Sequence, residues 1–486
     1  MDILKIKSCF VFNTALKSPK PKPSDDEAQD AKLLFYYPQN EELLIKRSNI
    51  GIIEGTLAFM SSFEETNTKF ILTELNKYYY VGNNYEKDFI VVFILEKNTP
   101  LFSQNQSIDS KKRFLKAFVD NYYHTFILFH NSLTSFFLNK ESPYIALEQL
   151  PKNKVSSFLD FTTSYLHLFA DMKLPFHEHL IYFPLKDQSQ AGILLAVQRL
   201  TEKVPDIEMS TIIYRGHIIH NQLPLESCSL IYNIFYNVFD FSSKFSKFKP
   251  PKTEQIQTTK DTTNDDNNNN NNNNHNNDND FSPFRKAFDL AGSNNDFLIG
   301  LQKASGNNYN IFIPCVYIRE LKTTFKMLVY YYNGMTVFIF LKDSFNIKSH
   351  LTTTLVNISK WITKYFIESI LKELENTFKS KLNYVENAMY VYCNNANKSL
   401  KITSHFFNKK NRELDNEKFD LIQKLFLLNA DVEMTSISKY KGYIIYYLNS
   451  CERNLVMLYS DNNSLSQVMS NIESTKKSTF DSIYMI

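Results

Sequence analysis

Glycine is scarce in this chain, with 10 among 486 residues. Loops that cradle phosphates place several glycines at fixed spacing, and neither GxxxxGK[ST] nor GxGxxG occurs in the sequence. A nucleotide-binding loop of either kind is therefore excluded. Cysteine is also sparse. The five cysteines are far apart and form no CxxC pair, which argues against a disulfide framework or a zinc site and indicates a reducing compartment.

Long apolar runs are absent too. No run reaches the ~18–20 residues that a membrane-spanning helix needs, and the first ten residues lack the apolar core of a signal peptide. Lys and Arg total 54 against 51 Asp and Glu, a net charge of +3. That balance gives no overall attraction to nucleic acid or anionic membranes. We expect a cytosolic protein that has no nucleic-acid partner.

Core-forming residues are abundant. Hydrophobic residues make up 43% of the chain and aromatic residues 15%, with 41 Phe and 29 Tyr supplying most of the aromatic share. At about 150 residues per domain, the length predicts three domains. An asparagine-rich tract at 264–280 has no apolar side chain to bury. It cannot offset roughly 1–2 kcal/mol of backbone entropy per ordered residue, so we expect a disordered spacer there.

Hydrophobic periodicity predicts alternating strands and helices over the first 175 residues. Two strands are joined by a Pro-rich, then acidic loop, and a helix with Asn40 as its cap follows. Three further strands and two long helices complete the segment. In chain order the predicted elements are strands 4–16 and 33–37, helix 40–63, strands within 70–95, and helices 110–137 and 155–170.

A similar order recurs twice. Asn333-Gly334 between two apolar runs is a strong two-residue hairpin signal, and Gly216 marks another hairpin. The further predicted strands are 179–185, those flanking Gly216, 311–318, 325–332, 336–342, 388–394, 399–405, 434–440, 443–449 and 454–460; the helices are 188–203, 225–240, 355–379 and 412–428. This content predicts an α/β (α+β) protein of three tandem domains, with antiparallel sheets flanked by helices. Their predicted ranges are 1–175, 176–380 with an insert at about 247–282, and 381–486.

Catalytic motifs are missing from the pattern. No GxSxG occurs, and the carboxylate pairs lie in polar loops that would not raise a carboxyl pKa. His177 and His179 form an HxH pair but precede a strand with no third ligand at a recognisable spacing. We therefore expect no catalytic side chains, metal or cofactor. A metal-dependent hydrolase that uses these two histidines is kept as a rival hypothesis.

Two stretches, KLLFYYPQN (32–40) and SNIGIIEGTLAFMSSF (48–63), resemble the opening of the Ccz subunit family. In that family a strand ending in a "FYHP"-like motif leads to a helix with an N-hydrophobic-G-x-x-E-A pattern and a terminal phenylalanine. The matching positions are Phe35, Tyr36, Pro38, Asn49, Gly51, Glu54 and Phe59. Gly55 stands where alanine is usual. HLIYFPLKD (179–187) resembles a second signature, "FFPLD", interrupted by Lys186, and the terminal FDSIYMI resembles the closing strand.

The resemblance implies three longin-type domains, each a five-stranded antiparallel sheet flanked by helices. It also implies a heterodimer with a Mon-type longin subunit. Together the two subunits would be a guanine-nucleotide exchange factor for a late-endosomal Rab-seven-type GTPase. Such a complex acts in endosome maturation, vacuole or lysosome fusion and autophagy, and is recruited peripherally to those membranes from the cytoplasm.

In longin-pair exchange factors, the first domains dimerise and present the shared surface. The resemblance therefore assigns the partner or GTPase interface to the first helix, with Asn49, Ile50, Gly51, Glu54 and Phe59 as its signature. The competing interpretation is that the apolar members fill the first domain's own core and that Glu54 faces water. A longin scaffold or adaptor without exchange activity is the alternative function.

Overall fold

The computed structural model describes most of the predicted elements. The described residues are 5–18, 20–62, 70–97, 108–137, 152–170, 179–182, 185, 187–239, 296–303, 309–332, 334–345, 358–360, 362–363, 370–376, 389–402, 421–422, 434–440, 442–450 and 452–475. The asparagine-rich tract and most of the predicted helix 412–428 lie outside them, as do parts of helix 355–379. Within the described part of the chain, no helix is both long and apolar enough to cross a membrane.

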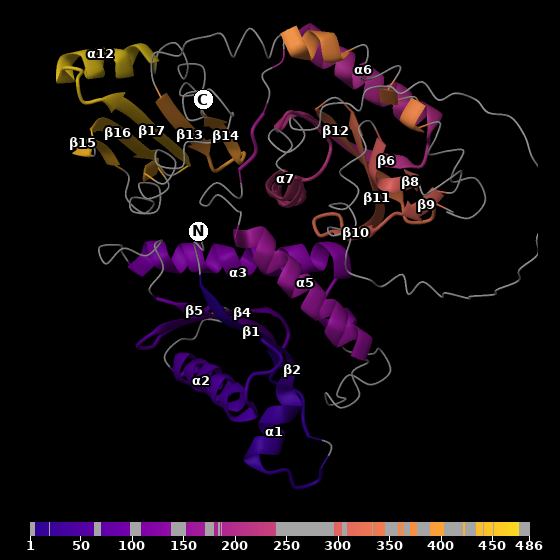
Figure 1. Cartoon of the computed structure of the whole chain (residues 1–486), viewed down its shortest axis with the longest axis vertical. Coiled ribbons are helices and arrows are strands. Elements are labelled where there is room, and N and C mark those ends of the chain that lie inside the picture. Colours follow the sequence, from indigo (N-terminus) through magenta and orange to yellow (C-terminus); the bar gives the residue numbers. More distant parts are fainter. Residues whose placement is uncertain are drawn as a thin grey trace, which may run out of the picture.

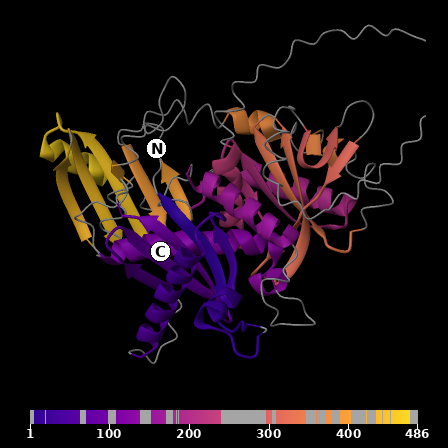
Figure 2. The same cartoon turned by 60° about the horizontal axis from the view of Figure 1, so that its bottom comes forward.

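Three antiparallel sheets follow one another along the chain (Figures 1 and 2). The first has the strand order β2-β1-β5-β4-β3. Its strands are β1 (Ile6–Asn13), β2 (Leu33–Tyr37), β3 (Phe70–Glu74), β4 (Tyr78–Glu86) and β5 (Phe89–Glu96). The third repeats this order as β14-β13-β17-β16-β15. Its strands are β13 (Met389–Asn394), β14 (Ser399–Ile402), β15 (Met434–Tyr440), β16 (Tyr443–Ser450) and β17 (Arg453–Ser460).

The middle sheet has the same arrangement with two additional strands. Its order is β7-β6-β12-β11-β8-β9, and β10 also pairs with β11, so β8 and β10 both pair with β11. The strands are β6 (Ile207–Tyr214), β7 (His217–Asn221), β8 (Asp296–Lys303), β9 (Tyr309–Phe312), β10 (Cys315–Ile318), β11 (Thr323–Tyr332) and β12 (Met335–Lys342). All three domains therefore share the predicted longin-type architecture.

Helices cover both faces of the first sheet. In Figure 1, α1 (Asp25–Lys32) and α2 (Leu43–Ser61) lie on the side away from the other two domains, while α3 (Ile108–His130) and α5 (Lys152–Ala170) lie between that sheet and the rest of the chain. The short α4 (Leu133–Phe137) follows α3. In the second domain α6 (Asp187–Lys203) and α7 (Leu225–Phe239) flank the sheet, and α12 (Leu465–Thr475) covers one face of the third sheet.

The core of the first domain continues into the second. Side chains of β1, β5 and α3 form one buried cluster with residues of α7, β10 and β11. Val316 and Ile318 of β10 are fully buried in it, next to α3. A separate cluster fills the opposite face of the first sheet, under α2. The first two domains are therefore packed together by apolar contacts, the dominant favourable term in folding and association.

The prediction of a loop between the first two strands was wrong for its acidic half. Residues 25–32 form α1, which Ser24 caps by accepting a hydrogen bond from the Glu27 backbone N–H at 3.3 Å. The Glu27 carboxylate in turn accepts a hydrogen bond from the Ser24 backbone N–H at 3.0 Å. This reciprocal pair satisfies backbone groups at the helix start. The predicted cap of α2 was also wrong, because the N-cap is Glu42, with no side-chain hydrogen bond.

The segment 179–185 was predicted as a strand, but its described residues 179–182 form isolated bridges instead. Leu180 pairs with Ser399 at the edge of the third sheet, and Tyr182 pairs with Ile218 at the edge of the second. The Leu180 N–H donates to Lys398 O at 2.6 Å, and the Ile218 N–H donates to Ile181 O at 2.7 Å. This short stretch therefore joins the inner edges of the two sheets. Strand β8 had not been predicted, and the predicted strand 311–318 is divided between β9 and β10.

His130 at the end of α3 provides a test of this core. Its ring packs against Phe126, Phe136 and Phe161, and this burial lowers its pKa to about 3. Below the unfolded-state value of about 6.5, the unfolded chain takes up a proton that the folded chain does not. Stability should therefore fall as the pH drops below 6.5, by at most about 1.4 kcal/mol per pH unit from this group.

We expect His130→Gln to flatten this pH dependence. Between pH 7 and pH 5 the wild-type chain should lose about 2 kcal/mol more stability than the variant. Denaturant midpoints of both proteins at pH 5, 6, 7 and 8 measure the difference. Parallel curves for the two proteins would show that His130 is not buried in the neutral form.

Candidate functional site

The predicted site lies on α2, which packs on the first sheet through one face. Ile50 and Ile53 are fully buried against β1, β4 and β5. Burial of such a side chain contributes about 1.5–3 kcal/mol, so these two residues hold the helix down. Ile50 therefore faces the domain's own core, as the competing interpretation held.

Asn49 also faces inward and is only 5% exposed. Its side-chain amide donates to the Tyr36 hydroxyl at 2.7 Å, and its carbonyl oxygen accepts from the Tyr80 hydroxyl at 3.0 Å. Tyr36 is on β2 and Tyr80 is on β4, so one side chain ties α2 to two strands. Because a buried amide left without partners costs about 1–3 kcal/mol, this contact fixes the rotation of the helix on the sheet.

Gly51 and Glu54 face α1. A Cβ added at Gly51 would stand 3.4 Å from Gln29 Nε2, and Glu54 accepts from Lys32 Nζ at 2.6 Å. Glu54 is therefore ion-paired, and 26% of its side-chain surface is still exposed. Glu54→Lys would first break the Lys32–Glu54 ion pair between α1 and α2. Its effect on a partner would be indirect.

Arg47 makes the strongest contact between the two helices. Its guanidinium donates to both carboxylate oxygens of Asp30, at 2.8 and 2.5 Å, and to Asp26 at 2.6 Å. Two parallel hydrogen bonds fix the relative direction of an arginine and a carboxylate. Sequence reasoning missed this residue. The signal available was an arginine on the predicted helix and a run of acids in the preceding loop, which had no assigned structure.

Phe59 alone among the five predicted site residues presents a large side chain outward, with 65% of its surface exposed. Leu44, about four helical turns before Phe59, is 74% exposed. Ser48, Gly55 and Ala58 are exposed between them. Positions 44, 48, 55 and 59 lie on one side of a helix, opposite to Ile53. We call this set, Leu44, Ser48, Gly55, Ala58 and Phe59, the outer face of α2.

The outer face has small residues at its centre and apolar ones at its ends. Nothing lies within 4 Å of a Cβ placed on Gly55. Small side chains let a second helix approach closely, toward the short end of the usual 8–10 Å interaxial distance. Large exposed apolar residues arranged on one face indicate an interaction surface. The arrangement can bind a polypeptide.

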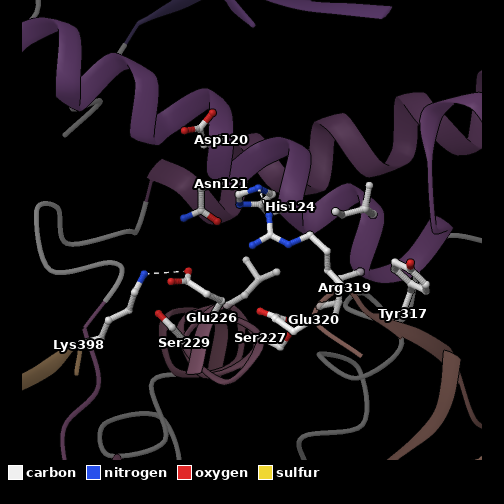
Figure 3. Close-up of a pocket in the computed structure, with 13 residues that line it drawn as sticks. Asp120, Asn121, His124, Glu226, Ser227, Ser229, Tyr317, Arg319, Glu320 and Lys398 are labelled. Atoms are coloured by element: carbon white, nitrogen blue, oxygen red, sulfur yellow. Dashed lines mark hydrogen bonds and ion pairs between the residues drawn. The ribbon is translucent and has the colours of Figure 1, made fainter. Parts of the chain in front are cut away.

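A second candidate is a cavity of about 110 Å³ where the three domains meet. Residues of α3, α7, the turn after β10 and Lys398 line it (Figure 3). His124 Nε2 lies 2.7 Å from Arg319 Nη1, Ser227 donates to Glu320 at 2.5 Å, and Lys398 pairs with Glu226 at 2.9 Å.

The His124–Arg319 and Lys398–Glu226 contacts join different domains, and the Ser227–Glu320 contact joins two elements of the second domain. A guanidinium carries only donors, so His124 accepts through Nε2 in this contact. We interpret the cavity as a polar junction that fixes the domains.

The predicted histidine pair is only partly described. His177 lies outside the described residues, and His179 Nε2 is 3.0 Å from Asn395 Oδ1. Among the residues that the structure describes, no group of three or more His, Cys, Asp or Glu side chains is placed to hold a metal ion.

Comparison with known proteins identifies relatives of the first domain. Residues 7–131 match the model of a family described as the first longin domain of INTU, CCZ1 and HPS4. The chain is also similar to proteins named vacuolar fusion protein CCZ1 homolog from Xenopus tropicalis and Xenopus laevis. Each is 21% identical over 233 residues, which cover 46% of this chain and 46% of the relative. The alignment therefore spans about half the length of these relatives. The resemblance to the Ccz family is confirmed.

We expect the hydrogen bonds of Asn49 to contribute measurably to stability. Tyr80→Phe removes the donor to its carbonyl oxygen and should lower the free energy of unfolding by about 1–3 kcal/mol. Tyr37→Phe is the matched control, because the Tyr37 hydroxyl makes no hydrogen bond among the described residues and its loss should cost less than about 0.5 kcal/mol. Denaturant titration compares them. Equal effects would mean that Asn49 does not anchor the helix.

Proposed function

We propose that this chain, whose first domain matches the longin family of INTU, CCZ1 and HPS4, acts in vesicle trafficking as one subunit of a two-chain guanine-nucleotide exchange factor. Its partner would be a Mon-type longin subunit, and the substrate a Rab-seven-type GTPase of late endosomes, lysosomes or vacuoles. Membrane recruitment would be peripheral. The outer face of α2 is the observation that supports this proposal most directly.

Three features of α2 suit it to pairing with another longin domain. Its inner side is fixed by Ile53 and by the Asn49 contacts, so the outer face has a defined direction. The ion pairs of Arg47 hold α1 along one flank of the helix. The helix also lies on the side of the first domain that faces away from the other two (Figure 1). A partner helix can therefore reach it without displacing any of the residues that the structure describes.

An exchange factor works by differential binding and makes no covalent bond. It favours the nucleotide-free form of the GTPase over the loaded form, by displacing a switch segment that contacts Mg²⁺ and phosphate. The nucleotide site then belongs to the GTPase, and the exchange factor contributes a shaped surface. A rigid helix between two longin domains provides such a surface. A scaffold without exchange activity would use the same pairing, so nucleotide release separates the two functions.

We expect Gly55→Gln to weaken pairing with the Mon-type subunit at least tenfold. The substitution should not harm the isolated chain, because the site is open and exposed and glycine costs about 1 kcal/mol relative to alanine in a helix. A glutamine side chain would instead hold a partner helix away. Gly192→Gln is the control: Gly192 is also exposed, within α6, with nothing within 4 Å of an added Cβ. Affinities of the two purified variants for the co-expressed partner give the comparison.

The exchange activity is measured with the same proteins. The wild-type pair should accelerate release of a fluorescent guanine nucleotide from the Rab-seven-type GTPase, and neither subunit alone should do so. Gly55→Gln should lower the rate in proportion to the pair lost. If the pair forms but release stays at the intrinsic rate for every endosomal Rab tried, the exchange function is wrong and the scaffold function replaces it. Equal affinity of the two glutamine variants would remove α2 from the interface.

A further inference from the structure

The third domain exposes its outermost strand, β15. Every residue from Met434 to Tyr440 pairs with β16 in one unbroken antiparallel register. The other side of β15 pairs with no strand in the described part of the chain, because the sheet order ends there. Such an edge presents a row of backbone N–H and C=O groups that can pair with another strand.

The side chains of β15 are uncovered on both faces. Of the six for which exposure is defined, Thr435 to Tyr440, five are exposed. Ile437, at the middle of the strand, is 39% exposed. It lies opposite Tyr446 on the face that α12 covers, so its exposed part borders the apolar cluster under that helix. A β-branched side chain at the centre of an edge can pack against a side chain of an added neighbouring strand.

The usual protections of an edge strand are weak here. Natural edges are shortened, bulged, interrupted by proline or guarded by lysine. β15 has seven residues, no bulge and no proline. Its one charged residue, Lys439, lies near the end and pairs with Asp461 after β17 at 3.3 Å. By contrast, the outer strands of the other sheets are shorter: β3 has five residues and β9 has four.

The chemistry of this edge indicates what binds it. Main-chain groups in a straight row are matched by an extended polypeptide, and the near-neutral charge favours an uncharged segment with alternating apolar side chains. The chain already uses this kind of contact at the opposite edge of the same sheet, where Leu180 in an extended stretch pairs with Ser399.

We propose that β15 receives a strand from the partner subunit, so that the third sheet continues into a second polypeptide. This inference rests on the proposed pairing with a Mon-type longin subunit and adds a second contact to it. The two contacts are on different domains: α2 on the first and β15 on the third.

Hydrogen exchange measures this contact directly. The full chain, alone and in the purified pair, is exchanged into D₂O, and the peptide that covers 434–440 is followed by mass spectrometry. We expect the amides of β15 that face away from β16 to be slowed at least tenfold in the pair. If the pair forms and these amides exchange at the same rate, the inference is wrong while the proposed pairing stands. If no pair forms, the proposed function itself fails, and this inference with it.

Two variants add an independent measurement. Ile437→Lys places a charge at the middle of the edge and should weaken the pair about tenfold. Leu465→Lys is the control, because Leu465 lies on α12 of the same domain, outside β15, and is 58% exposed. Its effect should stay within twofold. Equal affinities for the two variants would contradict the inference. Protection of β15 in the chain alone that rises with its concentration would assign the edge to a second copy and would also overturn it.

Discussion

The central strands of all three sheets are apolar on both faces, and this constraint governs the architecture. Almost every side chain of β5 and β12 is buried, and β17 differs only at its ends. Such strands cannot leave a face in water, so each sheet must be covered twice. In the first domain α2 covers one face, and α3 with α5 covers the other. The second face continues into the core of the second domain, whereas α2 keeps an exposed outer side.

The difference between the covered and the exposed side of α2 explains the roles of the predicted site residues on this helix. Asn49 bonds to two strands, Gly51 faces α1 and Glu54 pairs with Lys32. These residues set the position and rotation of the helix. Phe59, which looks like one more apolar residue in the sequence, is the member that points outward. A motif shared with a family of interacting proteins can thus consist mainly of residues that orient a surface, with the contacting residues between them.

Patterns in the sequence predicted the parts of the fold that local chemistry determines. The apolar run FIVVFIL and the Asn333-Gly334 signal identified β5 and the β11–β12 hairpin. α1 was missed, although its Ser24–Glu27 capping box is visible in the sequence. An eight-residue helix is marginal alone, and α1 depends on contacts with Arg47, seventeen residues or more away. The stretch 179–182 was predicted as a strand because its residues have the apolar character of one. It instead makes single bridges to two different sheets, through Leu180 and Tyr182.

The same limit applied to the candidate site. Periodicity places Asn49, Ile50 and Ile53 on neighbouring positions, but it does not say which side of α2 meets the sheet when nearly every turn has an apolar residue. Leu44 and Phe59 are as apolar as Ile50, and their exposure depends on where the Tyr36 and Tyr80 hydroxyls lie. The positions of these two hydroxyls are known only once the sheet has been assembled.

Two separate contacts with one partner raise affinity in a different way from one larger contact, because the second contact becomes intramolecular. In the proposed pair, a partner already bound at α2 would present its strand to β15 at an effective concentration set by the rigid spacing of the domains, and overall affinity can rise 10²–10⁴-fold over either contact. That gain requires the domains to keep their separation. The apolar cluster that joins the first two domains provides this rigidity, as do the bridges of residues 180–182 between the second and third. The polar junction around His124 and Lys398 adds contacts at the point where all three meet. Contacts between the domains of this chain can therefore affect its affinity for a partner, even though these contacts do not touch the partner.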